Sequence, residues 1–383
     1  FCYVVFSCNN LNKPQPETAL TALIGGSETA KDVSTAEELT AAIADVKFDI
    51  VKLTGDISIS NSLTVNRTVT LDLNGFVLKY QNDSQRGSVI VVKDGGQLTI
   101  EDSNTSNLSH RFNPNGKLWV LDEASGTETV TGGVITGGTG YPYQLYSTVN
   151  CGGGVYIAPG GQLTMTGGNI IGCSAEYGGG VCIYPKRDGE QGQFSMSGGS
   201  IAGCVASDIG GGVFASGTFK MSGPAVIRSC TAESATQYVC GGGVYVNGSS
   251  SFEMSDTAII EGCQAISTSS NSSNGGGVSA ACVKEITLAD SARIVGCAAA
   301  NGSGLYITGS QVPGYGILYA NSGSVDGDVV LGDTEDGPST ITGSGGTVFN
   351  GKVTVTPGSI IESGIFNGEV IKNGTITGGV FNN

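Results

Sequence analysis

The side chains that could carry catalytic or metal chemistry are few in this sequence. His110 is its only histidine, and it falls in a polar insertion from Asn104 to Asn115 where we expect a surface loop. No Cys-x-x-Cys pair occurs, so a zinc site is not expected. One acidic run carries oxygen ligands of the kind that Ca²⁺ prefers, but its order is unlike that of an EF-hand loop, and we interpret it as a solvated loop. Its members are Asp326, Asp328, Asp333, Glu335 and Asp336. We therefore expect no metal, no cofactor and no catalytic residue.

Repeated glycine triplets indicate which elements must position any site. Triplets or near-triplets begin at intervals of 26, 32, 31, 34 and 27 residues, at Gly152, Gly178, Gly210, Gly241, Gly275 and Gly302. Each unit contains three short runs separated by turns, and the first unit reads GGGVYI, GQLTMTGG and NIIGC. Three strands predict one triangular coil, and coils stacked about 4.8 Å apart form three parallel sheets around a shared core. The 383 residues are thus predicted to form an all-β, right-handed parallel β-helix, a three-sheet solenoid of roughly ten coils.

Aligned units show which residues are expected to fill the core. The first strand repeats one aliphatic position, at Val155, Val181, Val213, Val244, Val278 and Leu305. The second strand carries all four methionines of the chain at one position, Met165, Met196, Met221 and Met254, and Leu288 continues this column. A second column lies two residues earlier, at Leu163, Phe194, Phe219, Phe252 and Ile286. The third strand repeats Ile170, Ile201, Ile227, Ile260 and Ile294. We interpret all of these columns as inward-facing.

Cysteines recur three positions after the isoleucine column, at Cys173, Cys204, Cys230, Cys263 and Cys297. Cα atoms on stacked coils fall within disulfide range, but in-register side chains point in parallel and suit bridging poorly, so we expect free buried thiols. Any disulfide is expected among the cysteines outside this column, Cys151, Cys182, Cys240 and Cys282, with a connectivity that the sequence leaves open.

A helix is predicted before the first coil, over residues 34–47. Ser34-Thr35-Ala36-Glu37 is interpreted as a capping box, and Leu39, Ile43 and Val46 follow on one face. We expect this helix to cover the open end of the solenoid, because exposed strand edges pair with other chains. The chain is divided into 1–33, a tether, and 34–383, the solenoid with its helix.

An aromatic row supplies the one positive feature for binding. The residues next to the inward valine column lie on the outer face of the first strand, at Tyr156, Cys182, Phe214, Tyr245, Ser279 and Tyr306. Exposed rings on a rigid sheet suit sugar rings or a partner protein, and Tyr156, Phe214, Tyr245 and Tyr306 are the predicted ligand-binding residues. The alternative is that the rings reflect β propensity, or are buried beneath the long loops.

These repeats, with LDLNGFVL at Leu71 to Leu78 and VVKDGGQLTIEDS at Val91 to Ser103, resemble the pectin-lyase-like β-helix domains of gut-bacterial surface proteins and adhesins. The resemblance implies the fold and a surface-displayed, adhesin-like or glycan-binding role. It is specific for the fold and much less so for activity, because this fold hosts lyases, hydrolases, phage tailspikes and adhesins alike. The alternative is a polysaccharide lyase or glycoside hydrolase. The NTD, DD, GHG and RxK elements of polygalacturonases are absent, and Trp119-Val120-Leu121-Asp122 matches a pectate-lyase WxDH run only in part. Arg111 and the Lys186 to Glu190 loop are the places where mixed charge would allow catalysis.

The first residues and the net charge concern location and partners. Phe1 to Cys8 reads as the end of an apolar signal segment, and it resembles a bacterial lipobox in which Cys8 would be lipidated. We expect a monomer at the bacterial cell surface, exported, and bound to the membrane only through that lipid. A net charge of −15 argues against nucleic acid as a partner, because the protein repels phosphate groups. The partner that we expect is a glycan or a surface protein of a host or partner.

Overall fold

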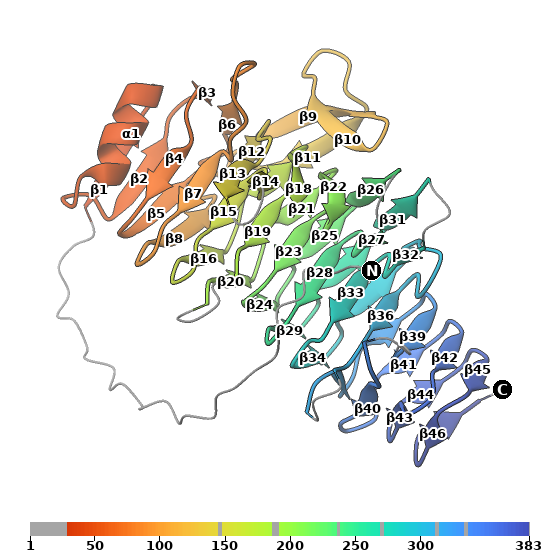
Figure 1. The fold of residues 1–383 in the computed structure, drawn as a ribbon. Coiled ribbons are helices and arrows are strands. Elements are labelled where there is room, and N and C mark those ends of the chain that lie inside the picture. The colour runs from red at the N-terminus through yellow and green to blue at the C-terminus, as the bar shows by residue number, and fades with distance from the viewer. Residues whose placement is uncertain are drawn as a thin grey trace, which may run out of the picture.

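The computed structural model describes residues 29–144, 148–185, 191–235, 238–268, 272–310, 314–332 and 336–382. In these residues the chain winds into a parallel β-helix whose coils stack along one axis (Figure 1). Three long sheets, named A, B and C, contain 13, 12 and 11 strands, all paired in parallel. The predicted three-sheet, all-β solenoid is confirmed, with slightly more strands per sheet than the predicted coil number.

Each coil contributes one strand to each long sheet. Sheet A comprises β1 (Ala30–Val33), β2 (Ile50–Leu53), β5 (Thr68–Asp72), β8 (Gln97–Glu101), β16 (Gln162–Met165), β20 (Gln193–Met196), β24 (Thr218–Met221), β29 (Ser251–Met254), β34 (Glu285–Leu288), β37 (Ile317–Ala320), β40 (Thr340–Thr342), β43 (Ile360–Ile361) and β46 (Thr375–Ile376). Sheet B comprises β3 (Ile57–Ile59), β6 (Val77–Tyr80), β12 (Val134–Thr136), β17 (Asn169–Ile171), β21 (Ser200–Ala202), β25 (Val226–Arg228), β30 (Ile259–Glu261), β35 (Arg293–Val295), β38 (Ser324–Val325), β41 (Val348–Phe349), β44 (Ile365–Phe366) and β47 (Val380–Phe381). Sheet C comprises β4 (Leu63–Val65), β7 (Ile90–Val92), β15 (Val155–Ile157), β19 (Val181–Ile183), β23 (Val213–Ala215), β28 (Val244–Asn247), β33 (Val278–Ala281), β36 (Leu305–Ile307), β39 (Val329–Leu331), β42 (Val353–Val355) and β45 (Val370–Lys372).

The predicted inward columns form one continuous core. Sheet A pairs Met165 with Met196, and the phenylalanine column stacks with ring centroids of Phe194, Phe219 and Phe252 at 4.8 and 5.0 Å from one ring to the next. The valine, methionine and isoleucine columns are all buried in the same cluster. In-register stacking of like side chains therefore decides the register, since a one-residue slip would turn every column outward.

The glycine triplets are required because the backbones of successive coils approach closely there. Gly152 has a φ of +59°, a conformation that other residues rarely adopt. A Cβ on Gly153 would lie 2.4 Å from the carbonyl oxygen of Gly179, and a Cβ on Gly154 would lie 2.4 Å from Cγ2 of Ile170. A side chain at any of the three positions would push neighbouring coils apart or strain the turn.

The helix α1 (Ala36–Ala44) covers the N-terminal end as expected, with Leu39 and Ile43 buried in the core (Figure 1). The predicted capping box was one residue out of register, because Thr35 is the N-cap and accepts a hydrogen bond from the backbone N–H of Glu38. Val46 lies beyond the helix and is 79% exposed, so its assignment to the buried face was wrong. The solenoid also begins before residue 34, because β1 pairs with β2.

Arg67 holds the C-terminal end of this helix to the solenoid. Its guanidinium donates hydrogen bonds to the carbonyl oxygens of Ile43, Ala42 and Phe48 at 2.7, 3.1 and 2.8 Å. The last carbonyl groups of a helix have no partner within it and carry partial negative charge. The Arg67 side chain therefore supplies hydrogen-bond donors to carbonyl groups at the C-terminal end of α1, and joins this end to the start of β5.

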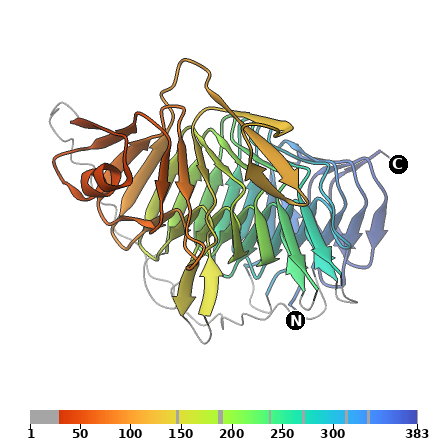
Figure 2. The same cartoon turned by 90° about the horizontal axis from the view of Figure 1, so that it is seen from above.

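Two smaller sheets pack on the outside of the solenoid (Figure 2). Sheet D is antiparallel and consists of β9 (Ser109–Asn115), β10 (Leu118–Leu121) and β11 (Glu128–Thr131). It covers part of the outer face of sheet B, where Phe112 and Trp119 are buried against Val134 and Ile171. The insertion that was expected to be a surface loop thus contains a strand.

Sheet E follows sheet B in the coils that carry glycine triplets. Its strands are β13 (Tyr141–Gln144), β14 (Thr148–Cys151), β18 (Ser174–Tyr177), β22 (Val205–Ile209), β26 (Thr231–Ser234), β27 (Val239–Cys240), β31 (Gln264–Ser267) and β32 (Ser273–Asn274). The hairpin β13–β14 is antiparallel, and the remaining pairs are parallel. Residues of sheet E and of the outer face of sheet C form a second buried cluster, so the two sheets pack against each other.

Candidate binding surface

The predicted aromatic row lies on the outer face of sheet C, as alternation requires, but most of it is not at the surface. Tyr156, Phe214 and Tyr245 are only 2, 2 and 3% exposed, whereas Tyr306 is partly exposed. The expectation that Tyr156, Phe214 and Tyr245 present open ring faces is therefore wrong, and the alternative of burial holds for these three. Sugar rings cannot stack on them in this structure.

Sheet E supplies the cover. The ring of Tyr177 stacks on Phe214 at a centroid distance of 5.3 Å, and Phe214 stacks on Tyr245 at 5.7 Å. From the hairpin, Tyr141 stacks on Tyr156 at 4.8 Å. Burial raises the pKa of the Tyr156 hydroxyl, which marks its surroundings as apolar. Tyr156, Phe214 and Tyr245 thus form the inner layer of a second core.

The outer edge of this second core is nevertheless accessible. Tyr141 and Tyr143 of β13 are partly exposed, and the ring of Tyr143 lies 4.1 Å from that of the buried Tyr184. The ammonium group of Lys93 donates a hydrogen bond to the hydroxyl of Tyr141 at 3.1 Å and lies 4.7 Å from the centroid of its ring. We call Tyr141, Tyr143 and Lys93 the tyrosine rim. Sequence repeats could not reveal it, because β13 occurs once, but the Tyr-Pro-Tyr run just before the first triplet is its sequence signal.

Two carboxylates lie on neighbouring strands of sheet E. Glu176 belongs to β18 and accepts a hydrogen bond from the backbone N–H of Asn150 at 2.7 Å. Asp208 belongs to β22, next to a shift in register between the two strands. Burial, and then the charge of Glu176, raise the pKa of Asp208 to about 7. Asp208 can therefore hold a proton near neutral pH, as a general acid must. No motif indicated this pair.

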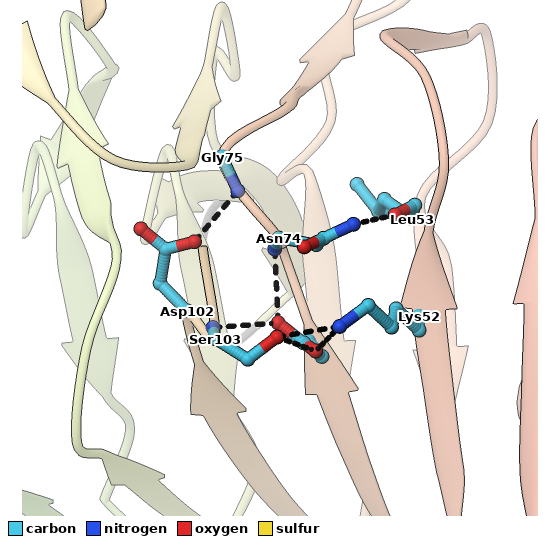
Figure 3. A network of polar contacts seen from close by, with 7 residues as sticks. Lys52, Leu53, Asn74, Gly75, Asp102 and Ser103 are labelled. Carbon is cyan, nitrogen blue, oxygen red and sulfur yellow. Dashed lines mark hydrogen bonds and ion pairs between the residues drawn. The ribbon is translucent and has the colours of Figure 1, made fainter. Parts of the chain in front are cut away.

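Polar side chains also gather at the corner between sheets A and B near the N-terminus (Figure 3). The Lys52 ammonium lies 3.0 Å from Oδ2 of the buried Asp72 carboxylate, and Ser103 donates to the same oxygen at 2.5 Å. Burial raises the pKa of Asp72, but the hydrogen bonds from Ser103 and the charge of Lys52 outweigh it and keep the pKa below its usual value. Lys52 is thus paired with a carboxylate, and its ammonium group also donates a hydrogen bond to Oγ of Ser103 at 2.6 Å.

The neighbouring residues of this corner bind backbone groups. Asp102 accepts a hydrogen bond from the N–H group of Gly75 at 2.6 Å, and Asn74 donates to the carbonyl oxygen of Leu53 at 2.9 Å (Figure 3). Asp102 also accepts a hydrogen bond from the N–H group of Gly133 at 2.7 Å. The bonds of Asp102 to Gly75 and of Asn74 to Leu53 join successive coils, whereas the bond to Gly133 closes the corner of the coil that contains Asp102. The network therefore ties successive coils together at this corner.

His110 is buried, in contrast to the predicted surface loop. It lies in β9, with Nε2 2.8 Å from the carbonyl oxygen of Gly75 and Nδ1 2.8 Å from Oε1 of Glu123. Glu123 also accepts from the backbone N–H of Arg111 at 3.1 Å. The imidazole joins sheet D to the corner described above, and both of its nitrogens are occupied by that role.

The thiol column has the form that was predicted. Cys173, Cys204, Cys230 and Cys263 are buried free thiols, and Cys297 is a partly exposed one. The residues of the acidic run that the structure describes have partners or lie in turns: Asp326 forms an ion pair with Arg293, and Asp328 accepts from the N–H of Lys352. Among the described residues, no group of three or more His, Cys, Asp and Glu side chains is arranged to hold a metal ion.

Several expectations concern residues outside the described ranges. Cys8, the predicted lipidation site, belongs to residues 1–28, and the charged loop from Lys186 to Glu190 also lies outside them. Asp333 and Glu335 of the acidic run do so as well. No helix within the described part of the chain is long and apolar enough to cross a membrane.

Comparisons with known proteins leave the class at the level of the fold, a parallel β-helix. No protein-family profile and no curated protein matches the sequence. One solved structure, described as L. reuteri 53608 SRRP, matches over 92% of this chain and 98% of its own chain, with 13% identity and a TM-score of 0.27. At that identity and score, the likeness says nothing about what this chain binds, and the family remains a resemblance.

Proposed function

We propose that this chain is an adhesin-like β-helix displayed on a bacterial surface, and that it binds a glycan through the tyrosine rim. The observation that carries this proposal is the placement of Tyr141 and Tyr143 as partly exposed rings on a buried aromatic layer. Rings held in this way lose little conformational entropy when a sugar stacks on them. Lys93 adds a cationic donor beside Tyr141 for a sugar hydroxyl or carboxylate.

The other buried polar side chains described above stabilise the solenoid, and this is consistent with a binding role. Asp72, Asp102 and His110 form hydrogen bonds with groups of the solenoid or of sheet D. A binding protein needs only a rigid frame and a contact surface, and the continuous core of this solenoid supplies the frame.

The test is retention of the purified full chain on a panel of immobilised plant and host polysaccharides. Tyr141→Ala and Tyr143→Ala should each weaken retention roughly two- to tenfold, the scale of one aromatic contact of about 0.5–1.5 kcal/mol. Tyr319→Ala is the matched control, because Tyr319 is a partly exposed tyrosine on the outer face of sheet A, away from the rim. Equal retention of all three variants and the parent chain would refute the rim as the binding site.

A polysaccharide lyase or glycoside hydrolase is the second candidate, and the Glu176–Asp208 pair favours it. Asp208 would donate a proton to the leaving group, and Glu176 would act as base or nucleophile. Product release from the same polysaccharides should then occur, and Asp208→Asn should abolish it. If no reducing ends or unsaturated products appear with any polysaccharide of the panel, this candidate fails while the binding proposal stands.

Attachment to the cell surface through Cys8 belongs to the same proposal. A lipid chain contributes about 0.8 kcal/mol per buried CH₂ group to membrane binding. The chain expressed with its N-terminal segment should therefore sediment with membranes, and the Cys8→Ser variant should stay in the supernatant. Equal partitioning would remove the lipid anchor and leave the binding site untouched.

A further inference from the structure

The residues directly before the glycine triplets face the outer row of sheet C. Tyr177 precedes Gly178, and its ring stacks on Phe214 of β23. In the register of the two sheets, Cys151 pairs with Tyr177 and Cys182 pairs with Phe214. Cys151 and Cys182 therefore occupy, one coil earlier, the same two facing positions as the stacked rings.

The two thiols meet inside the second core. Cys151 and Cys182 are both 0% exposed, and both belong to the buried cluster between sheets E and C. Burial, and then a hydrogen bond with the Cys151 thiol, raise the pKa of the Cys182 thiol. Tyr156 and Tyr184 belong to the same buried cluster as both thiols. The two thiols are thus enclosed together by aromatic side chains.

No other facing position in the described part of this core offers two cysteines. Cys240 lies three pairing steps beyond Cys151 along sheet E and precedes Gly241, but the outward residue on the following coil of sheet C is Ser279. The five cysteines of the inward column lie at one register on successive coils, so their side chains point in parallel and suit bridging poorly. Side chains that approach from two packed sheets are directed toward each other, which is the arrangement that inter-sheet disulfides require.

We propose that Cys151 and Cys182 form a disulfide when this chain folds in an oxidising compartment, and that the bond joins sheet E to sheet C. The oxidant is a small-molecule disulfide such as glutathione disulfide. One cysteine thiolate attacks it, releases one glutathione and forms a mixed disulfide, and the second thiolate displaces the other glutathione. Two cysteine thiols lose two protons and two electrons, and one glutathione disulfide becomes two glutathione molecules.

The reaction belongs to folding, because the finished fold protects both thiols. Burial raises the pKa of the Cys182 thiol, and the thiolate is the reacting species. Once formed, the bond would fix β14, and with it the antiparallel partner β13 that carries Tyr141 and Tyr143. The disulfide would therefore hold the tyrosine rim in place, although its formation is independent of whether the rim binds glycan.

The test maps disulfides in the full chain, prepared both by refolding from urea with reduced and oxidised glutathione and by export to the oxidising periplasm of an expression host. Trypsin cannot separate the two cysteines, because no Lys or Arg lies between them, whereas cleavage after Glu176 and after Met165 can. Unreduced peptides should show Cys151 linked to Cys182. The melting temperature should exceed that of the reduced protein by about 5 °C, as a loop of this length stabilises a domain of this size class by a few degrees.

Cys151→Ser and Cys182→Ser should each lose both the linked peptide and the rise in melting temperature. Cys173→Ser, a change in the inward column, is the matched control and should retain both. If a variant fails to fold, the disulfide map of the parent chain alone tests the proposal. Nine free thiols among the described cysteines after either preparation, or a bond that joins Cys151 or Cys182 to another cysteine, would overturn the proposal.

Discussion

Replacement of Tyr156 by alanine separates a structural role of the aromatic row from a direct role in binding. The side chain is 2% exposed and its ring contacts Tyr141, Tyr143 and Tyr184 at centroid distances of 4.8, 6.1 and 6.2 Å. Truncation would leave a cavity between two packed sheets that the rigid strands cannot close. Large-to-small changes of buried aromatic residues cost about 3–5 kcal/mol, so the free energy of unfolding should fall by that amount.

The measurement is urea unfolding of the full chain followed by circular dichroism, together with hydrogen exchange. Because each coil contacts only its neighbours, lost protection should concentrate in β14, β15 and β18 and not spread evenly along the solenoid. Tyr319→Ala serves again as the control and should cost less than about 1 kcal/mol, since its ring is partly exposed. The reasoning is refuted if Tyr156→Ala costs less than about 1 kcal/mol and still abolishes glycan retention, because the ring would then act at the surface.

Three further changes test other parts of the structure. Ile227→Asp places an unpaired charge in the isoleucine column of the core and should lower the free energy of unfolding by more than about 4 kcal/mol in urea titrations, whereas unchanged unfolding would contradict the inward assignment. Arg67→Met removes the donors to the carbonyl groups at the end of α1 and should cost about 1–3 kcal/mol, with lost hydrogen-exchange protection confined to α1 and the first coils; uniform loss along the solenoid would contradict the capping role. Asp208 has a folded pKa of about 7 against an ordinary value of 3.8, so the folded state binds the extra proton and stability should fall as pH rises from about 4 to about 7. Asp208→Asn should remove that decline and stabilise the chain at pH 8 by about 1–2 kcal/mol after allowance for solvent screening, and an unchanged pH profile would show that the carboxyl group titrates normally.

Much of the fold could be predicted from the sequence because a solenoid is nearly one-dimensional. Each coil packs only on the coils before and after it, so columns of valine, methionine, phenylalanine and isoleucine at fixed register predict the inward face directly. The glycine triplets predict the tight turns for the same reason, because the contact of Gly153 with Gly179 is a contact between adjacent coils. The thiol column followed from that register as well.

The helix was harder to place in detail. Ser34 and Thr35 are both capable N-cap residues, and each is followed three positions later by a glutamate, Glu37 or Glu38. The choice of Thr35 depends on how the chain leaves β1, which pairs with β2 from a distance in the sequence. The exposure of Val46 follows from that shorter helix, which ends at Ala44.

Only the tertiary structure decided which outward residues reach solvent. Alternation along β15 correctly places Tyr156 outside the first core, but it contains no information on the strand that later lies over it. The covering strands of sheet E differ in length and sequence from coil to coil, so they do not form a recognisable repeat. The strand β13 and sheet D each occur once in the described residues, so no repeat predicts them. The same holds for His110, which is buried through contacts with Gly75 and Glu123. The direction of a side chain is a local property of the strand, and the sequence determines it. Burial depends on which distant segments pack against that side chain, and this is set only when the whole chain has folded.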